Sequence, residues 1–264
     1  MHPILIQFGP LTLYTYGLLV AMAFLAGLGL ALRQAKREGI DPQQVMDLAF
    51  YVVIAAIGGS RLLYVLMNPG HYLQEPLSIF KIWEGGLVFY GGLLFALPIS
   101  ALYVIKKHLT LATMADIFAP SLALGHAIGR WGCFFAGCCY GKPTDLPWAI
   151  TFTDPHSLAP RGIPLHPTQI YESAMNLSIF FLLLAFQGRK RHPGQVFWLY
   201  LLLYSIGRFL IEYLRGDERG MLLGLSTSQF LGILLALLAI LMLLRPLRGV
   251  GPGRRAAIPG EKGA

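Results

Sequence analysis

Long apolar runs separated by short polar segments dominate the pattern along this chain of 264 residues. Seven of these runs reach or approach the roughly 20 residues that a helix needs to cross a bilayer. The predicted spans are 11–32, 45–67, 87–105, 111–135, 170–186, 196–214 and 225–244. The pattern therefore predicts an all-α integral membrane protein, a bundle of about seven transmembrane helices.

The composition agrees with this fold class and excludes a soluble globular domain. Only 13% of the residues are charged, whereas a soluble domain carries about 25%, and the mean hydropathy is +0.60. The first apolar run has no basic segment before it and no small-residue cleavage site after it, so we expect a retained first span. Internal periods of 20 to 50 residues do not recur, which argues against a repeat architecture.

The loop charges predict the orientation. Thirteen basic residues fall in the first, third and fifth connections and in the tail, against five in the opposite connections. The positive-inside rule then places the N-terminus outside the cell and the C-terminus in the cytoplasm. The same topology explains the formal net charge of +8 better than binding of nucleic acid does.

This topology also divides the chain. We expect one seven-span catalytic domain over residues 1–245 and a basic, disordered cytoplasmic tail over 246–264. The two longest loops, roughly 68–86 and 136–169, are expected on the extracytoplasmic side.

Three arginines lie inside apolar spans: Arg61, Arg130 and Arg208. An arginine at the centre of a membrane helix costs about 2.5 to 3.5 kcal/mol even on a lenient scale. Each is therefore expected to face the bundle interior or an aqueous cavity. The alternative is that they form ion pairs between helices and only fix helix register.

Helical spacing gives each arginine polar neighbours on its own face of the helix. These are Tyr64 beside Arg61, His126 and Cys133 beside Arg130, and Tyr204, Glu212 and Arg215 beside Arg208. Glu212 is placed to pair with Arg208 or Arg215. Because the guanidinium group binds phosphate in a bidentate manner, these faces favour a site for a phospholipid.

Two glycine-rich passages accompany the arginines. One surrounds Arg130 over residues 129–141, and the other holds Tyr90, Gly91 and Gly92 at the start of the third span. Such passages let the backbone approach a ligand closely. The alternatives are close helix packing through small residues and an interfacial anchor role for the tyrosine. A polar cluster over 165–172, including His166, enters the fifth span.

The three cysteines, Cys133, Cys138 and Cys139, are too few for a disulfide framework. A zinc site is disfavoured because no second C-x-x-C pair exists and because the adjacent side chains at 138 and 139 are expected to diverge. We therefore expect no metal site, and we interpret the cysteines as small packing residues.

Taken in order, these segments closely resemble the prolipoprotein diacylglyceryl transferase family. The core of the resemblance is the segment His126-Ala-Ile-Gly-Arg-Trp-Gly-Cys-Phe-Phe-Ala-Gly-Cys-Cys-Tyr-Gly141, which looks like the family signature. Four further blocks, at 59–64, 86–92, 166–172 and 204–212, match in register. The resemblance covers nearly the whole chain, from the first span to the seventh.

The resemblance implies a bacterial inner-membrane enzyme with its site on the extracytoplasmic side. Such an enzyme transfers the diacylglyceryl group of phosphatidylglycerol to the lipobox cysteine of a prolipoprotein signal peptide. A thioether forms, glycerol 1-phosphate leaves, and no metal or organic cofactor is required. This transfer is the first step of bacterial lipoprotein maturation.

The resemblance also suggests roles for individual residues. Arg130 is expected to bind the lipid phosphate, and Arg208 to stabilise charge on the leaving oxygen or the thiolate, with Glu212 orienting it. Tyr90 and Tyr16 are expected to position the head group. The further residues expected to bind substrate are Arg61, Gly91, Gly92, His166 and Tyr204.

Two departures from the family pattern bear on this interpretation. Some members carry histidine at the position of Tyr90, proposed as the base for the thiol, and others carry tyrosine. Asparagine stands in other members at the positions of Cys133 and Ala136, so these side chains are expected to be dispensable. The rival hypotheses are a transporter or channel for an anionic solute, in which the arginines line the pathway, and a lipid-binding scaffold without chemistry.

Overall fold

The structure is a computed structural model that describes residues 2–8, 11–217, 220–222 and 224–245. Seven long helices dominate it: α1 (Thr15–Arg37), α2 (Pro42–Met67), α4 (Phe89–Lys106), α5 (Leu111–Ala136), α6 (Thr168–Gln187), α7 (Gln195–Glu212) and α8 (Thr227–Leu244). Each is long and apolar enough to cross a membrane. The seven predicted spans are thus confirmed. The predicted disordered tail, 246–264, lies outside the described residues.

The beginning of the first span differs from the prediction. Residues 11–14, which were expected to be helical, form strand β2 (Leu11–Tyr14), which pairs with β1 (Ile4–Phe8) in an antiparallel hairpin. The helix begins only at Thr15, whose hydroxyl donates to the carbonyl oxygen of His2 over 2.6 Å. Strand pairing satisfies the backbone of residues 11–14, which hydropathy alone could not distinguish from a helix start.

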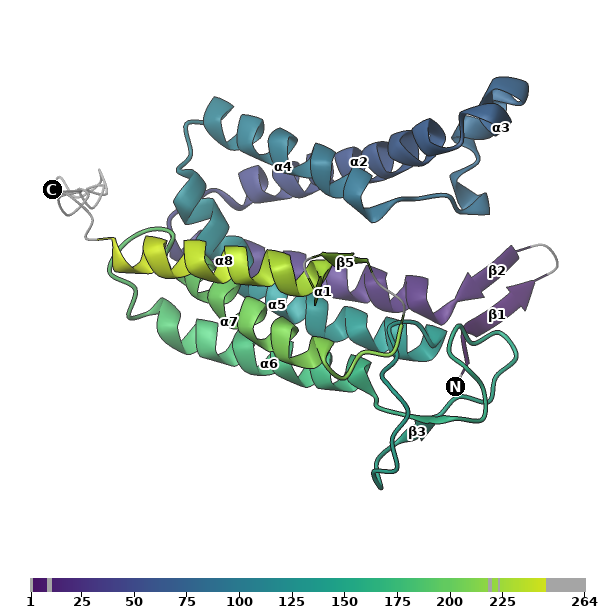
Figure 1. The fold of residues 1–264 in the computed structure, drawn as a ribbon. Helices are drawn as coiled ribbons and strands as arrows, with labels where there is room; N and C mark the ends of the chain where they lie inside the picture. The colour runs from purple at the N-terminus through teal and green to yellow at the C-terminus, as the bar shows by residue number, and fades with distance from the viewer. Residues whose placement is uncertain (1, 9–10, 218–219, 223, 246–264) are drawn as a thin grey trace, which may run out of the picture.

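The helices form two groups that diverge toward one end of the molecule (Figure 1). Helices α1, α5, α6, α7 and α8 pack in one bundle, while α2 packs mainly against α4. The two groups meet at the other end, where a buried cluster joins the ends of α1, α2, α4 and α5. Its members are Ala31, Ala35, Val45, Leu48, Tyr103, Val104, Met114 and Ile117.

The α2–α4 pair depends on glycines at its crossing. A Cβ atom added at Gly59 would lie 2.5 Å from the carbonyl oxygen of Gly91 and 2.7 Å from Cβ of Phe95. Gly92 faces the backbone of Ala56 in the same contact. Small residues let membrane helices approach closely where lipid offers no hydrophobic driving force. The glycines of the second passage therefore have a packing role.

Replacing Gly59 with alanine should separate the α2–α4 pair and destabilise the protein, since the new methyl group would meet backbone atoms that cannot move aside. Overpacking of this kind costs about 1–3 kcal/mol. The matched control is Gly58→Ala, because a Cβ there meets no atom within 4 Å. Thermal unfolding in detergent should show a lower midpoint for the first variant only. Equal midpoints for the two variants would contradict the close crossing.

The connecting segments gather at the two ends of the bundle. One end carries α3 (Pro69–Gln74), the 3₁₀ turns η1 (Pro76–Phe80) and η2 (Ile82–Glu84), and the short strands β3 (Ile150–Thr151) and β4 (Pro164–Leu165). Figure 1 shows the N-terminal hairpin at this same end and the last turn of α8 at the other. Strands β5 (Met221–Leu222) and β6 (Leu225–Ser226) lead into α8.

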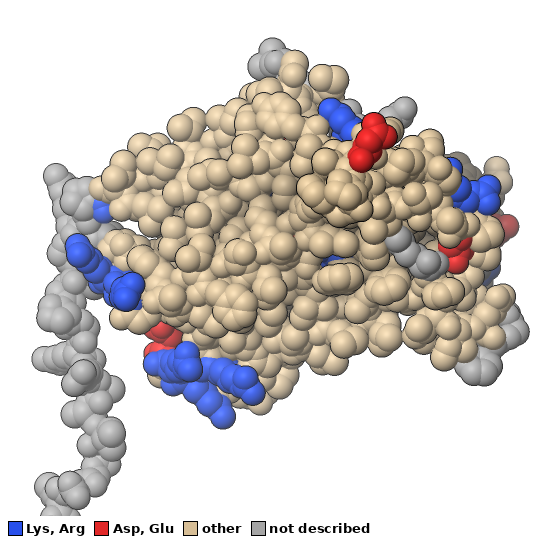
Figure 2. Space-filling model, turned by 90° about the horizontal axis from the view of Figure 1, so that it is seen from below, with Lys and Arg blue, Asp and Glu red and all other residues tan. Residues whose placement is uncertain are grey.

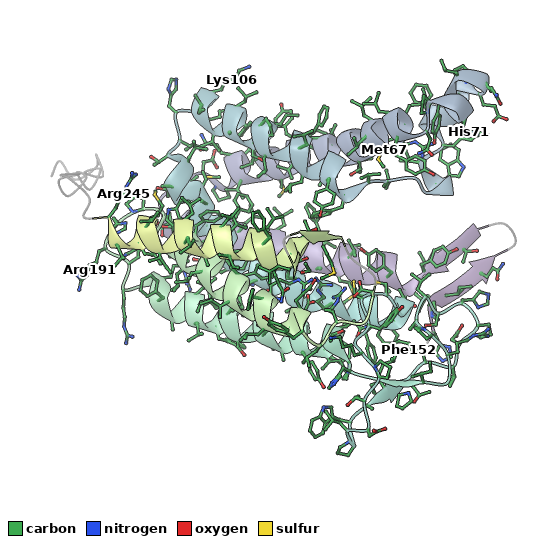
Figure 3. All side chains as sticks on the ribbon, viewed as in Figure 1. Met67, His71, Lys106, Phe152, Arg191 and Arg245 are labelled. Atoms are coloured by element: carbon green, nitrogen blue, oxygen red, sulfur yellow. The ribbon has the colours of Figure 1, made fainter. Side chains whose placement is uncertain are left out.

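Charged side chains follow the same division. Lys106, Arg191 and Arg245 lie at the C-terminal end, whereas His71 and Phe152 mark the opposite end (Figure 3). The face in Figure 2 is largely uncharged between these ends. At the C-terminal end Asp116 is buried and accepts hydrogen bonds from the backbone N–H groups of Gly194 and Phe197, at 2.8 and 3.0 Å. A carboxylate at this position stabilises the N-terminus of α7.

Candidate active site

A single buried carboxylate, that of Glu172 in α6, organises the largest group of charges inside the bundle. Its Oε2 lies 2.6 Å from Nε of Arg130, and its Oε1 lies 3.0 Å from Nη1 of Arg215 and 3.7 Å from Nη1 of Arg208. We call these residues, with Glu212 and Asp217, the Glu172 cluster. It brings two of the three arginines predicted to lie inside spans, and a third from a loop, to one place.

Two further carboxylates complete the cluster. Glu212 pairs with Arg208 one helical turn away, which confirms the predicted pairing. Asp217 binds Arg215 through two parallel contacts of 2.7 and 2.8 Å. Three arginines thus face three carboxylates, so the formal charges balance. Such balance explains how these side chains, 18%, 9% and 2% exposed for Arg130, Arg208 and Arg215, are accommodated inside the bundle.

Neighbouring groups stabilise the protonated form of Arg215. Burial by itself would lower the pKa of the guanidinium, but the hydrogen bonds to Asp217 and the negative charge of Glu172 outweigh that effect. The pKa of Arg215 is consequently raised above its usual value, so the side chain stays protonated at all physiological pH values.

Arg215 is positioned in the site by hydrogen bonds between its own segment and the loop that follows α5. Backbone N–H groups of Lys142 and Gly216 donate to the carbonyl oxygens of Leu214 and Tyr140, at 2.8 and 3.1 Å. These bonds join the loop to the segment that follows α7, and they hold the side chain of Arg215 in its buried position. Helical spacing predicted Arg215 near Glu212, in the connection after the sixth span, but its pairing with Glu172, 43 residues away along the chain, leaves no local signal.

Glu172 was not predicted as a site residue, although a signal for it exists. Thr168, Gln169, Glu172, Ser173 and Asn176 are all buried, and their spacing of three and four places them on one face of α6. The stripe also holds the segment that follows α5. Gln169 and Thr168 donate hydrogen bonds to the carbonyl oxygens of Cys138 and Cys139, at 2.8 and 2.7 Å. A polar stripe of this length on an apolar span indicates a buried network.

Three of the residues predicted to bind substrate lie in the same bundle as the cluster. The ring of Tyr16 packs against Gly132, where an added Cβ would lie 3.2 Å from it. Tyr204 lies near Arg130, and its ring packs at a tilt of 31° against that of His126, with ring centroids 5.3 Å apart. His166 is half-buried in the loop before α6, with its Nδ1 3.4 Å from the hydroxyl of Tyr171.

The other predicted residues belong to the α2–α4 pair. Arg61 is buried and donates to five backbone carbonyl oxygens of the loop 78–86, at 2.6 to 3.3 Å. Arg61 therefore holds this loop against α2. Gly91 and Gly92 lie in the helix crossing, and Tyr90 is 65% exposed. Their roles toward substrate stay predictions.

The three cysteines converge, contrary to the expected divergence of Cys138 and Cys139. All three Sγ atoms lie within 4.8 Å of one another. The reason is the backbone: Gly137 ends α5 in the left-handed conformation, and Cys139 is itself left-handed with φ of 62°. Two consecutive side chains can then turn toward Cys133. The Sγ of Cys133 is also 3.9 Å from Nη1 of Arg130.

Comparison with known proteins identifies the family of this chain. The family model described as prolipoprotein diacylglyceryl transferase matches residues 3–245. A phosphatidylglycerol–prolipoprotein diacylglyceryl transferase of Clostridium tetani is 38% identical over 91% of this chain and 96% of its own. Proteins of the same name from Thermosynechococcus vestitus and Geobacter sulfurreducens are 41% and 38% identical, covering 81% and 96% of this chain and 81% and 98% of their own. The chain therefore belongs to the prolipoprotein diacylglyceryl transferase family.

Proposed function

We propose that the Glu172 cluster is the site at which this transferase moves the diacylglyceryl group of phosphatidylglycerol onto the lipobox cysteine of a prolipoprotein. The observation that supports this most is the convergence of Arg130 and Arg208 on one buried carboxylate. Nη1 of Arg208 is buried and forms no hydrogen bond with the described residues. A phosphate oxygen is the ligand that such an arginine suits best.

In this proposal the phosphate enters between Arg130 and Arg208. The contact between Arg208 and Glu172, at 3.7 Å, is longer than a hydrogen bond and therefore the easiest to exchange for a phosphate oxygen. Glu172 and Glu212 hold the two guanidinium groups before the lipid arrives. Such preorganised charge stabilises a transition state without the cost of reorientation.

The reaction requires one bond to form and one to break. The sulfur of the lipobox cysteine attacks the glycerol carbon of the diacylglyceryl group, the bond between that carbon and the phosphate oxygen breaks, and glycerol 1-phosphate leaves. Nearby arginines favour the thiolate and stabilise the phosphate that departs. The chemistry written in this way needs no metal and no organic cofactor.

The remaining predicted residues surround this centre in the proposal. Tyr16 and Tyr204 position the head group from α1 and α7, and His166 contributes from the loop before α6. Tyr90, Gly91, Gly92 and Arg61 act from the α2–α4 pair.

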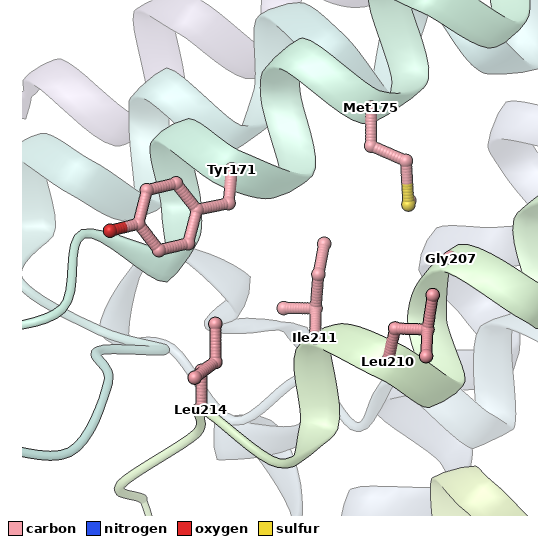
Figure 4. Close-up of a pocket in the computed structure, with 6 residues that line it drawn as sticks. All are labelled: Tyr171, Met175, Gly207, Leu210, Ile211 and Leu214. Carbon is pink, nitrogen blue, oxygen red and sulfur yellow. The ribbon is translucent and has the colours of Figure 1, made fainter.

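A groove on the membrane-facing side of α6 and α7 suits an acyl chain (Figure 4). It has a volume of about 370 Å³ and is lined by Tyr171, Met175, Gly207, Leu210, Ile211 and Leu214. Two of these residues directly adjoin Glu172 and Glu212 in sequence. An acyl chain lying there would place its glycerol near the arginines, which supports the assignment of a lipid substrate.

The positive-inside distribution supports an extracytoplasmic site in the bacterial inner membrane. The end that carries the cluster also carries the N-terminal hairpin and the loops 68–86 and 136–169. Fusions to the C-terminus test this orientation. A fluorescent protein should fluoresce there and alkaline phosphatase should be inactive, whereas active phosphatase would reverse the assignment.

Purified protein incubated with phosphatidylglycerol labelled in its acyl chains and a lipobox peptide tests the activity. Thin-layer separation should reveal lipidated peptide and glycerol 1-phosphate, and a peptide with serine for cysteine should yield none. Only the enzyme makes this product, so its absence would favour the transporter or scaffold hypotheses.

A further inference from the structure

The three thiols lie in a part of the site that the proposed reaction does not use. Cys133 is in the last turn of α5, and Cys138 and Cys139 follow the left-handed Gly137. They are the only cysteines of the chain, and none forms a disulfide. The carbonyl oxygens of Cys138 and Cys139 are held by Gln169 and Thr168 of α6. The end of α5, the turn that follows it and the hydrogen bonds from α6 therefore bring the thiols together.

The backbone at Cys139 strengthens this interpretation. Its φ of 62° lies in the left-handed region, which is uncommon for a residue other than glycine, asparagine or aspartate. Strained backbone of this kind persists only where the surroundings impose it, and it is concentrated at functional sites. Here its effect is to turn a second consecutive thiol toward Cys133.

Two arginines adjoin the thiols. Nη1 of Arg130 lies 3.9 Å from Sγ of Cys133, and Arg215 lies near Cys139. Neighbouring cations favour the thiolate, which is the form that binds metal ions. Both guanidinium groups therefore lie where they would face the negative charge of a cation bound to three thiolates.

The number and type of the ligand atoms indicate which metal ion this group of cysteines would bind. Among the described residues the group contains three sulfur ligands and no histidine or carboxylate side chain that would serve as a fourth. Soft thiolate ligands bind Cu(I), zinc and iron–sulfur clusters. Structural zinc is almost always bound by four ligands and iron–sulfur clusters typically by four cysteines, so a set of three thiolates fits Cu(I) better. We propose that Cys133, Cys138 and Cys139 form a three-thiolate site for a soft, thiophilic cation of the Cu(I) type.

Binding is balanced by proton release. Each thiol loses its proton to solvent as its sulfur bonds to the ion, so three neutral thiols and one monovalent cation become a complex of net charge −2. Arg130 and Arg215 face this charge. No electron is transferred, and the reaction needs no oxidant.

Anaerobic titration of the full chain in detergent with Cu(I), against a chromophoric chelator, tests the site. We expect one ion per chain, and we expect alkylation by maleimide to fall from three thiols per chain to none. The variant Cys139→Ser should lose more than about 100-fold in affinity, since even the outer partners of metal ligands contribute 10- to 100-fold. The triple serine variant controls for binding by the eight methionines.

Three results would overturn the site. They are equal affinity in the triple variant, a loss below 10-fold in Cys139→Ser, and protection of only two thiols at saturation. Where a serine variant fails to fold, alkylation of the wild-type chain still counts the ligands, because the metal must protect all three thiols together.

A second arm rests on the proposed function. A complex of charge −2 beside Arg130 would repel the lipid phosphate and weaken its binding. One equivalent of Cu(I) should therefore lower diacylglyceryl transfer by the wild-type chain at least 10-fold. The rate of the triple serine variant should not change when Cu(I) is added. Tight binding without inhibition would contradict the role of Arg130 in phosphate binding while supporting the metal site. Inhibition equal in both chains would contradict the site.

Discussion

Replacement of Arg130 or of Arg208 by lysine will lower the rate of diacylglyceryl transfer by about 100-fold or more, the scale of losing one preorganised donor to a developing charge. Lysine keeps the positive charge but presents a compact ammonium group instead of a planar fork. In Arg130→Lys the Nε contact to Glu172, now 2.6 Å, would be lost. In Arg208→Lys one nitrogen must serve Glu212 and the phosphate together.

The measurement is transfer from labelled phosphatidylglycerol to a lipobox peptide at several lipid concentrations. Arg191→Lys is the matched control, because Arg191 is exposed at the opposite end of the molecule. It should retain the wild-type rate. If both site variants kept near-normal rates, bidentate binding of the phosphate would be wrong.

The variant Glu172→Gln should be the most destabilising conservative change in the chain. Glutamine has the same shape, but it removes the one carboxylate among the described residues that contacts Arg130, Arg208 and Arg215 together. Arg130 would lose its carboxylate and three cations would face two anions inside the bundle. Breaking a buried ion pair by removing one partner costs about 3–5 kcal/mol.

Thermal or denaturant unfolding in detergent measures this loss. Glu75→Gln is the control, since it makes the same chemical change at an exposed position and should leave the midpoint unchanged. An unchanged midpoint in Glu172→Gln would show that the cluster contributes no stability. Its guanidinium groups would then be held by other contacts.

Much of the fold follows from local composition. A bilayer provides no hydrogen-bond partners for the backbone, so a run of apolar residues long enough to cross it must form a helix. For this reason all seven helices were predicted, and most of their bounds agree within a few residues. The exception is residues 11–14, where pairing with β1 offered the backbone another partner.

The site was predictable only where its geometry is local. Arg208 and Glu212 are one turn apart on a single helix, and their pairing follows from helical periodicity alone. Arg130 was identified because a charge within an apolar run is costly. Helical spacing also placed Arg215 near Glu212, but neither Glu172 nor Arg215 was predicted as a site residue. These two side chains meet through contacts between α6 and the loops that follow α5 and α7.

For the cysteines, local reasoning predicted a geometry that the structure contradicts. Cys138 and Cys139 were expected to diverge on any backbone. That expectation is valid for a helix or a strand, but not for the conformation found here. The left-handed backbone at Gly137 and Cys139, held by hydrogen bonds from α6, reverses that geometry.

By itself, then, the sequence determined the membrane class, the seven helices and two of the three arginines that meet at Glu172, because burial in lipid constrains each segment independently of the others. The tertiary structure decided which charges meet and that three thiols converge. It also decided that Gly91 and Gly92 pack against α2. These properties depend on distances between segments far apart in the chain, which no local pattern of residues specifies.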